Sequence, residues 1–384
     1  MEQKTNVKVL IAAFFGIFFF GLAYIVLGAI LPDLQKQLSL SDPQCSTLAS
    51  MLPLGTLFGS LVFGPIIDRF GYKLLLTGAT ALGIAGLGII AGSSDFALVA
   101  LGVILTGLCG GMLNGSTSAL VSDISSDNSR TSNLFILGIV YCIGSFTIPL
   151  IMASAGNADF RTILFVACAV MALSMLYYIV IKFPEAKCKQ GIPMGEIVKM
   201  IKEPILIIFA FTLFFQSSLE GLANTWTRTY YENSSIFAGN PAVILTFIPI
   251  GLAISRVLLA VISRFVKGSV IIAVSMLFAV AGAALLPFAT SQTVAIIGAL
   301  ILGMGLAAGF PVVFGIVGEK FSKMSGTAFS FCLVIALLGN TLLNSLIGAL
   351  GVNTLPVIMI ASAGLLFVLF TIGNTLSHKT TKSK

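Results

Sequence analysis

The stretch VLIAAFFGIFFFGLAYIVLGAI, from Val9 to Ile30, decides the fold class of this chain. Its 22 residues carry no charge. A helix of that length is about 33 Å long, which is enough to cross the hydrocarbon core of a bilayer. The run is longer than the core of a signal peptide and lacks a small-residue cleavage site, so we expect it to remain as a membrane span.

The same composition continues through all 384 residues, of which 57% are apolar and 9% charged. A soluble domain has roughly 25% charged residues, so soluble enzymes and nucleic-acid-binding proteins are excluded. Long apolar runs predict an all-α membrane protein, because open sheet edges cannot be satisfied in lipid. Twelve transmembrane helices are expected near residues 8–31, 45–67, 74–93, 96–122, 132–154, 162–182, 205–229, 241–263, 269–289, 293–317, 326–350 and 355–376.

The Lys and Arg residues are distributed unevenly over the predicted loops. Seventeen of the 21 fall on the side that holds both termini, Lys36, Arg161 and Arg228 fall on the other, and Arg256 lies inside a span. The positive-inside rule therefore predicts that both termini are cytoplasmic. Short loops and small size favour a bacterial inner membrane, and the predicted fold works as a monomer in the lipid bilayer.

The chain divides at a Lys-rich stretch, residues 183–204, near its middle. We therefore predict an N-terminal six-helix bundle over 1–182, a cytoplasmic linker over 183–204, and a C-terminal six-helix bundle with a short tail over 205–384.

Weak sequence repeats indicate that the two bundles are pseudo-symmetric. IDRF (67–70) recurs as ISRF (262–265), and Gly144 corresponds to Gly339, both at an offset of 195 residues. GLCGG, which begins at Gly107, resembles GLAAG, which begins at Gly305, at a slightly larger offset. A duplicated bundle of this kind occurs in some secondary transporters.

The seventh predicted span carries the clearest chemical signal. Gln216, Glu220 and Asn224 are spaced four residues apart and form one polar stripe on an apolar helix. A carboxylate inside a membrane costs about 2.5 to 3.5 kcal/mol, so Glu220 must face a cavity, a partner or a proton. A structural role through hydrogen bonds to neighbours is the alternative. Trp226, the only Trp, suits either an interfacial belt or stacking on a sugar ring.

Other polar side chains lie inside predicted spans and are candidate substrate ligands: Tyr24, Asn114, Tyr141, Asn340 and Asn344. Hydrogen bonds between helices explain many such residues equally well. Arg256 is expected to brace backbone carbonyls or Glu319 rather than pair directly with Glu220.

No cofactor or metal site is indicated. The six Cys include no CxxC pair, and the single His, His378, lies in the polar tail. A P-loop for ATP is absent from the sequence, so transport would draw on an ion gradient.

The string GPIIDRFGYK, from Gly64 to Lys73, resembles the signature of the major facilitator superfamily, with one basic position replaced by Tyr72. The resemblance implies the major facilitator fold and a gating role for Gly64, Asp68, Arg69, Gly71, Lys73 and Asp123, with Arg256 added from its place in the eighth span. We expect Asp68 to meet positive side chains or helix amino termini of the other half, and Asp123 to accept from Arg69 or Arg130. The second half has Ser263 in place of Asp68, so its latch should be weaker or absent.

Three further stretches resemble the fucose, galactose and glucose proton-symporter family. They are FFQSSLEGLANTW (214–226), SRVLLAVISRF (255–265) and RTSNLFILGIVYCIGSFTIP (130–149). This resemblance implies uptake of a monosaccharide with a proton, by alternating access. Tyr24 and Asn114 stand where the fucose branch has acids within its first and fourth spans, so proton coupling would depend on Glu220 alone.

The expected function is therefore a proton-linked secondary transporter of a small polar substrate, most simply a sugar, and not an enzyme. Gln216, Asn224, Trp226 and Asn340 would assist Glu220. A uniporter, an exporter of amphipathic or drug-like compounds, and a membrane sensor that binds without transporting are the alternatives.

Overall fold

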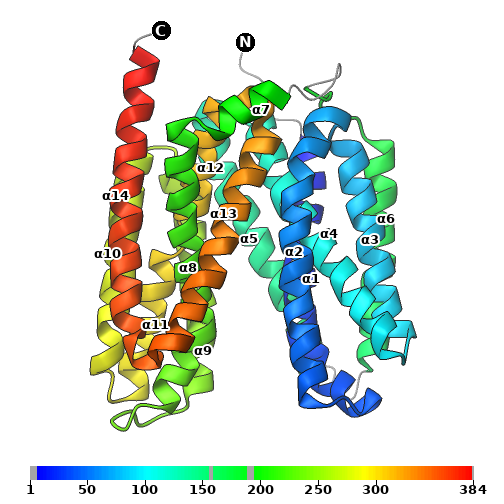
Figure 1. Ribbon diagram of the computed structural model, residues 1–384, viewed down its shortest axis with the longest axis vertical. Coiled ribbons are helices and arrows are strands. Elements are labelled where there is room, and N and C mark those ends of the chain that lie inside the picture. Colours follow the sequence, from blue (N-terminus) through cyan, green and yellow to red (C-terminus); the bar gives the residue numbers. More distant parts are fainter. Residues whose placement is uncertain (1–6, 155–158, 188–193, 383–384) are drawn as a thin grey trace. The chain divides into compact units, whose positions relative to one another are not determined.

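A computed structural model describes residues 7–154, 159–187 and 194–382. The described residues are almost entirely helical (Figure 1) and contain no strand beyond an isolated bridge between Ala238 and Ser291. The α-helices are α1 (Val7–Leu38), α2 (Asp42–Phe70), α3 (Tyr72–Gly92), α4 (Phe96–Ile124), α5 (Asp127–Ser154), α6 (Phe160–Val180), α7 (Met194–Ile201), α8 (Pro204–Glu232), α9 (Pro241–Ile262), α10 (Gly268–Leu285), α11 (Gln292–Gly305), α12 (Gly309–Lys320), α13 (Ser325–Leu350) and α14 (Leu355–Lys382).

Twelve stretches of the described residues are long and apolar enough to cross a membrane, as the sequence predicts. The short helix α7 lies in the predicted linker and has only 8 residues. Residues 188–193 of that linker, with 1–6 and 383–384 at the termini, lie outside the described residues.

Local signals set where several helices begin. The Asp95 carboxylate accepts a hydrogen bond of 2.9 Å from the Leu98 amide at the start of α4, and the Asp159 carboxylate accepts from the Arg161 amide at the start of α6. Such caps satisfy amide groups that have no partner inside the helix. Pro204 occupies the first position of α8, where its missing N–H costs nothing.

The chain forms two compact units. Unit 1 comprises Met1–Ser126, Leu137–Met194 and Phe321–Ser330, and unit 2 comprises Asp127–Ile136, Gly195–Lys320 and Phe331–Lys384. Each unit thus contains most of one half of the sequence and a short helix end from the other half.

Close helix crossings repeat within the two units. A Cβ added at Gly55 of α2 would lie 2.4 Å from the Ile104 carbonyl of α4, and one at Gly251 of α9 would lie 2.3 Å from the Leu300 carbonyl of α11. Both residues of the second pair follow those of the first by 196 positions. Only glycine permits backbones to approach so closely, so the repeat is preserved in the packing of the helices.

The same offset corrects the predicted match between the two Gly-rich strings. A Cβ at Gly107 would lie 2.3 Å from the Leu52 carbonyl, and one at Gly303 would lie 2.0 Å from the Ile248 carbonyl. Gly107 therefore corresponds to Gly303 rather than to Gly305. The letters of the two strings align better two residues away, but backbone contact determines the true register.

The tenth span is interrupted, although a single helix over 293–317 was expected. Helix α11 ends at Gly305 and α12 begins at Gly309, leaving 306–308 outside both. Pro311, near the start of α12, has no N–H to donate to the Ala307 carbonyl, and its ring clashes with that carbonyl in a continuous helix. Proline and two flanking glycines therefore end one helix and start another within one span.

Candidate functional site

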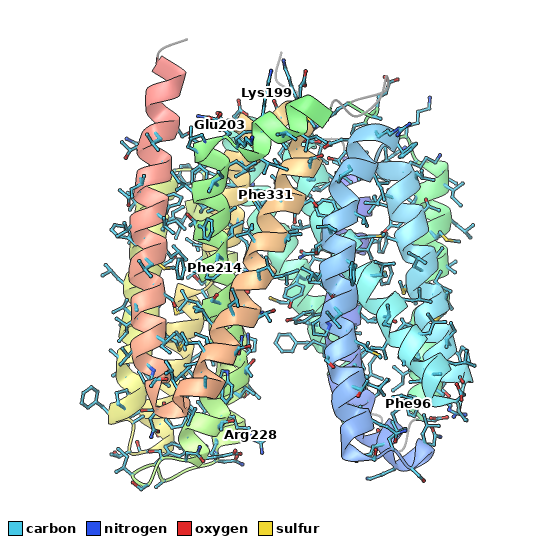
Figure 2. The ribbon with its side chains drawn as sticks, in the orientation of Figure 1. Phe96, Lys199, Glu203, Phe214, Arg228 and Phe331 are labelled. Atoms are coloured by element: carbon cyan, nitrogen blue, oxygen red, sulfur yellow. The ribbon has the colours of Figure 1, made fainter. Side chains whose placement is uncertain are left out.

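The polar stripe of α8 is the first candidate site, and it belongs to unit 2. Figure 2 shows Phe214 part-way along α8, between Glu203 at one end and Arg228 near the other. Glu220 follows Phe214 by six residues, so its carboxyl lies well inside the span Pro204–Glu232. The side chain of Glu220 is half-buried, whereas Gln216 is completely buried and Asn224 is exposed.

Hydrogen bonds organise this stripe around Glu220. The Gln216 side-chain amide donates to Glu220 Oε1 at 3.0 Å, and the Asn224 amide donates to the Glu220 backbone carbonyl at 2.8 Å. Gln216 also donates to the Leu306 carbonyl at 2.8 Å. Both amide hydrogens of Gln216 are therefore bonded within unit 2, and its role as a substrate ligand stays a prediction.

A second set of polar contacts joins α8 to α13. The Trp226 indole N–H donates to Asn344 Oδ1 at 2.9 Å, and the Asn344 amide donates to Asn340 Oδ1 at 2.6 Å. Gly221 makes this approach possible, because a Cβ there would lie only 1.8 Å from Asn340 Oδ1. The orientation of the half-buried Trp226 ring is therefore set by a hydrogen-bonded chain.

Arg256 of α9 is buried and acts electrostatically on Glu220. The sequence predicted that Arg256 braces backbone carbonyls or Glu319 rather than pairing directly with Glu220. The ion pair of Glu319 is formed with Arg130, at 3.9 Å, and Arg130 also pairs with Asp127 at 3.0 Å. The buried cation of α9 is thus part of the surroundings of Glu220.

Tyr24, Tyr141 and Asn114 belong to unit 1. The rings of Phe20 and Tyr141 stack with centroids 5.2 Å apart, and Phe20 also contacts Tyr24 at 5.7 Å. Tyr24 is exposed over 43% of its surface. Asn114 is half-buried on α4, and its backbone carbonyl accepts from Ser118 at 2.9 Å.

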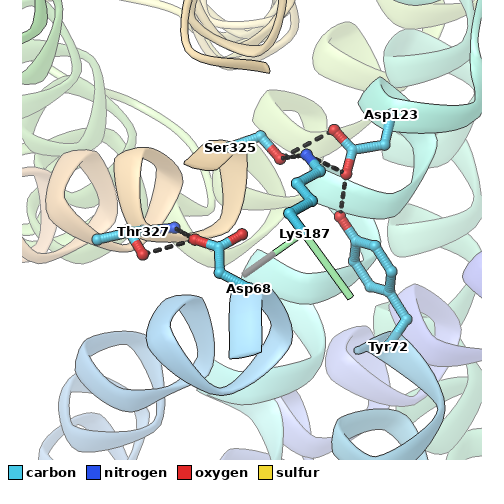
Figure 3. A network of polar contacts seen from close by, with 6 residues as sticks. All are labelled: Asp68, Tyr72, Asp123, Lys187, Ser325 and Thr327. Atoms are coloured by element: carbon cyan, nitrogen blue, oxygen red, sulfur yellow. Dashed lines mark hydrogen bonds and ion pairs between the residues drawn. The ribbon is translucent and has the colours of Figure 1, made fainter. Parts of the chain in front are cut away.

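The second candidate site is a network at the end of α2, also in unit 1 (Figure 3). Asp68 is 1% exposed, and its Oδ2 accepts from the Thr327 amide at 2.8 Å and from the Thr327 hydroxyl at 2.6 Å. Thr327 lies in the first turn of α13, where amide groups lack partners within the helix. Asp68 of the first half therefore caps a helix that belongs to the second half, as the signature led us to expect.

Two glycines permit this contact. A Cβ at Gly64 would lie 2.4 Å from the Gly326 carbonyl, and one at Gly326 would lie 2.4 Å from the side chain of Ile67. Gly71 ends α2 with a φ of +84°, a conformation that other residues rarely adopt. These close contacts and this turn place Asp68 directly against the start of α13.

Asp123 completes the network through partners that differ from those predicted. Its Oδ2 accepts from the Tyr72 hydroxyl at 2.5 Å and pairs with Lys187 at 2.6 Å, and its Oδ1 accepts from the Ser325 hydroxyl at 2.8 Å. Lys187 also donates to Ser325 at 2.6 Å (Figure 3). We refer to Asp68, Tyr72, Asp123, Lys187, Ser325 and Thr327 as the Asp68 network.

The expected partners of Asp123, Arg69 and Arg130, are engaged elsewhere. Arg69 is exposed and its guanidinium lies over the Phe70 ring, 5.0 Å from the centroid. Lys73 donates to the Ile179 carbonyl at 2.5 Å. Lys187 was missed because it lies in the linker, 64 positions after Asp123, and only the fold brings the two together.

A counterpart of the Asp68 contact exists in unit 2. The string match at an offset of 195 placed Ser263 opposite Asp68, but the backbone contacts of α2 and α9 give an offset of 196. At that offset Asp68 corresponds to Arg264, whose Nε donates to the Ser132 hydroxyl at 3.1 Å. Ser132 corresponds to Thr327 at the offset of 195 and donates to the Ala260 carbonyl. This second contact contains no carboxylate, and whether it acts as a weaker latch stays a prediction.

Comparison with known proteins agrees with this architecture. The family profile described as Major Facilitator Superfamily matches residues 13–342. The uncharacterized MFS-type transporter YfkL of Bacillus subtilis is 23% identical over 354 residues, which cover 89% of this chain and 88% of YfkL. The solved structures that match this chain have even lower sequence identity, so their similarity shows the fold alone.

Two solved transporters share that fold. The crystal structure of FucP, the E. coli fucose:proton symporter, matches with a TM-score of 0.81 at 16% identity, over 96% of this chain and 98% of FucP. The human organic anion transporter MFSD10 matches with a TM-score of 0.70 at 16% identity, over 96% of this chain and 99% of its own. With twelve spans, the signature at α2 and the family profile in agreement, this chain belongs to the major facilitator superfamily, a family of membrane transporters rather than enzymes.

Proposed function

We propose that this chain imports a small, neutral, polar solute, in the first place a monosaccharide, together with a proton by alternating access. The observation that carries the proposal is the Glu220 carboxyl, half-buried well inside an apolar span and hydrogen-bonded by Gln216. Low-dielectric surroundings favour the protonated form of a carboxyl, so Glu220 is suited to bind and release a proton during transport.

The chemistry around Glu220 favours a polyhydroxylated substrate. Asn224 is exposed beside it, and the Trp226 ring is held in one orientation by Asn344. Amides bind hydroxyl groups as donor and acceptor, and an indole face packs against the C–H face of a sugar ring. The similarity to FucP supports the same substrate class.

The Asp68 network supplies the proposed gate. The contact between Asp68 and Thr327 joins the two halves of the sequence within unit 1, and so does the bond of Lys187 to Ser325. With the termini in the cytoplasm, this network would close the cytoplasmic side of the pathway and would break when that side opens. A monomer in a bacterial inner membrane suffices for this mechanism.

A uniporter is the second candidate, and one observation favours it. Tyr24 and Asn114 occupy the first and fourth spans, where acids would offer additional proton sites. A transporter with a single carboxyl at depth can use that carboxyl to bind substrate without moving protons. Export of amphipathic compounds is supported by the similarity to MFSD10, an organic anion transporter.

Uptake into proteoliposomes distinguishes these functions. Labelled hexoses and pentoses are offered with acid outside, with and without a protonophore. We expect uptake of at least one sugar that collapses with the protonophore, and loss of that gradient-driven uptake in Glu220→Gln. Glu203→Gln, at the end of the same helix, is the matched control and should transport normally.

Each other outcome overturns part of the proposal. Saturable uptake that ignores the protonophore identifies a uniporter or another coupling ion. Absence of sugar uptake, combined with resistance to amphipathic compounds on overexpression, identifies an exporter.

A further inference from the structure

We infer that Gln216 is a positioning residue that links the protonation of Glu220 to the interruption of the tenth span. The inference rests on the proposed function, because it assigns Glu220 the role of proton site. The structural basis is one buried side chain that contacts both partners: Gln216 donates to Glu220 Oε1 at 3.0 Å and to the Leu306 carbonyl at 2.8 Å.

The hydrogen bonds of Gln216 determine which way its amide points. A primary amide has two N–H donors and one acceptor oxygen. Both of its neighbours, a carboxylate and a backbone carbonyl, are acceptors, so the NH₂ group must face them. The opposite orientation would place the amide oxygen against two acceptors. Gln216 Oε1 is buried without a hydrogen-bond partner among the described residues, so the amide is held from its NH₂ side alone.

Protonation of Glu220 weakens this hold. A hydrogen bond to an ionised carboxylate is roughly twice as strong as a neutral one. When Glu220 binds a proton, the bond from Gln216 becomes neutral, and the new carboxyl O–H has the vacant Oε1 of Gln216 as a potential acceptor. The amide is then free to turn, and a turned amide presents its oxygen rather than an N–H to the Leu306 carbonyl.

The Leu306 carbonyl lies where the tenth span is most easily bent. Residues 306–308 belong to neither α11 nor α12, and Pro311 prevents the helix from closing across them. Freed carbonyls inside a membrane need another donor, which Gln216 supplies. Gly309, the first residue of α12, is also in tight contact, since a Cβ there would lie 2.1 Å from Gln216 Oε1. Movement of the amide therefore acts directly on both sides of the interruption.

Among the charged groups around Glu220, its own carboxyl is the group whose protonation changes with pH. Arg256 of α9 is the charged side chain that acts on it electrostatically. In the other helices near α8, charged or titratable side chains are confined to the far ends of α12 and α14, and α13 has only its Cys332 thiol, 0% exposed. Arginine keeps its charge over the accessible pH range, so a pH response at the interruption would come from Glu220.

Hydrogen exchange measured by mass spectrometry tests the link without requiring the substrate. The purified full chain in nanodiscs is compared at acid and at alkaline pH, with exchange corrected for its intrinsic pH dependence. We expect amides over 306–312 to exchange about tenfold faster in acid, while a peptide inside α11 does not change. Glu220→Gln should exchange at the acid level at both pH values.

Gln216→Leu keeps the size of the side chain and removes both donors. We expect fast exchange over 306–312 at both pH values and a loss of the pH response. Gly309→Ala, which displaces the amide without touching Glu220, should have the same effect if Gln216→Leu fails to fold. Ser218→Ala, a buried polar change on the same helix, is the matched control and should behave as wild type.

Different results would overturn the proposed symport and the role assigned to Gln216. If wild-type uptake ignores a protonophore, the proposed symport is wrong whatever the exchange shows. If uptake is proton-coupled and Gln216→Leu retains the wild-type pH response over 306–312, the role assigned to Gln216 is wrong and the symport stands.

Discussion

Replacing Asp68 with Asn tests the proposed gate most sharply. The substitution keeps the shape of the side chain and an acceptor oxygen but removes the charge. Each charge-assisted hydrogen bond contributes about 1.5 to 3 kcal/mol, and the charge provides roughly half of that. Asp68 accepts two bonds, from the amide and the hydroxyl of Thr327, and lies at a helix amino terminus, where a negative charge contributes a further 0.3 to 1 kcal/mol or so.

One effect acts in the opposite direction. Asp68 is 1% exposed, so the substitution also removes the cost of burying a carboxylate. The stabilising contributions sum to about 1.8 to 4 kcal/mol, and after subtracting the burial cost we take about 1.4 to 2 kcal/mol as the net weakening of the closed network. This corresponds to a ~10- to ~30-fold increase in the population with the network open.

The assay is the labelling rate of a buried reporter thiol. Ala328, on α13 next to Thr327, is 0% exposed and is changed to Cys in a background without the native Cys. An impermeant maleimide is added to inside-out vesicles, where labelling requires the network to open. Asp68→Asn should raise the rate ~10- to ~30-fold, and Thr327→Val should raise it as well.

Asp95→Asn is the matched control, because Asp95 also caps a helix but is exposed and Asn caps equally well. Its labelling rate should equal that of wild type. A rate for Asp68→Asn within twofold of this control would refute the account of the gate.

Three further predictions follow from other contacts. Lys187→Ala removes the cation from the nearly buried Asp123. Because Lys187 is 24% exposed, we expect the closed network to lose about 1 to 2 kcal/mol, seen as faster labelling of the same reporter. Lys187→Arg should label nearly as wild type. Ser132→Ala removes a hydrogen bond from the charged Arg264 guanidinium and one to the neutral Ala260 carbonyl, so hydrogen exchange at the start of α5 should rise roughly ten- to a hundredfold. Gly221→Ala would force apart the hydrogen-bonded chain of Asn340 and Asn344 that holds Trp226, the only Trp. The intrinsic fluorescence should therefore shift, and sugar affinity should fall about tenfold. An unchanged spectrum would contradict the proposed orientation of the ring.

The sequence was sufficient to predict the twelve spans, and the reason is physical. A helix in lipid must be apolar along most of its length, so runs such as Val9–Ile30 can be recognised as spans without knowing which helices they pack against. The interruption at 306–308 was missed because Gly305, Gly309 and Pro311 are common in membrane helices and need not break them. At the break, Gln216 donates from another helix to the Leu306 carbonyl, a contact that spacing along the tenth span does not reveal.

The candidate site residues also fall into those that local sequence spacing predicts and those that only the fold brings together. The spacing of Gln216, Glu220 and Asn224 places them on one face of one helix, which periodicity predicts. Spacing within one helix does not predict which residues from distant parts of the chain contact these side chains. Lys187 replaced the expected arginines beside Asp123 because its linker folds back on α4 and α13, a contact that spans 138 positions in the case of Ser325.

The central claim is that Glu220 carries a proton with the substrate, and the most direct test measures that proton. Proteoliposomes loaded with a pH-sensitive dye receive an inward gradient of a transported sugar with no proton gradient imposed. We predict acidification of the lumen in wild type, and sugar entry without acidification in Glu220→Gln. Sugar entry without acidification in wild type, or equal acidification in Glu220→Gln, would contradict the account.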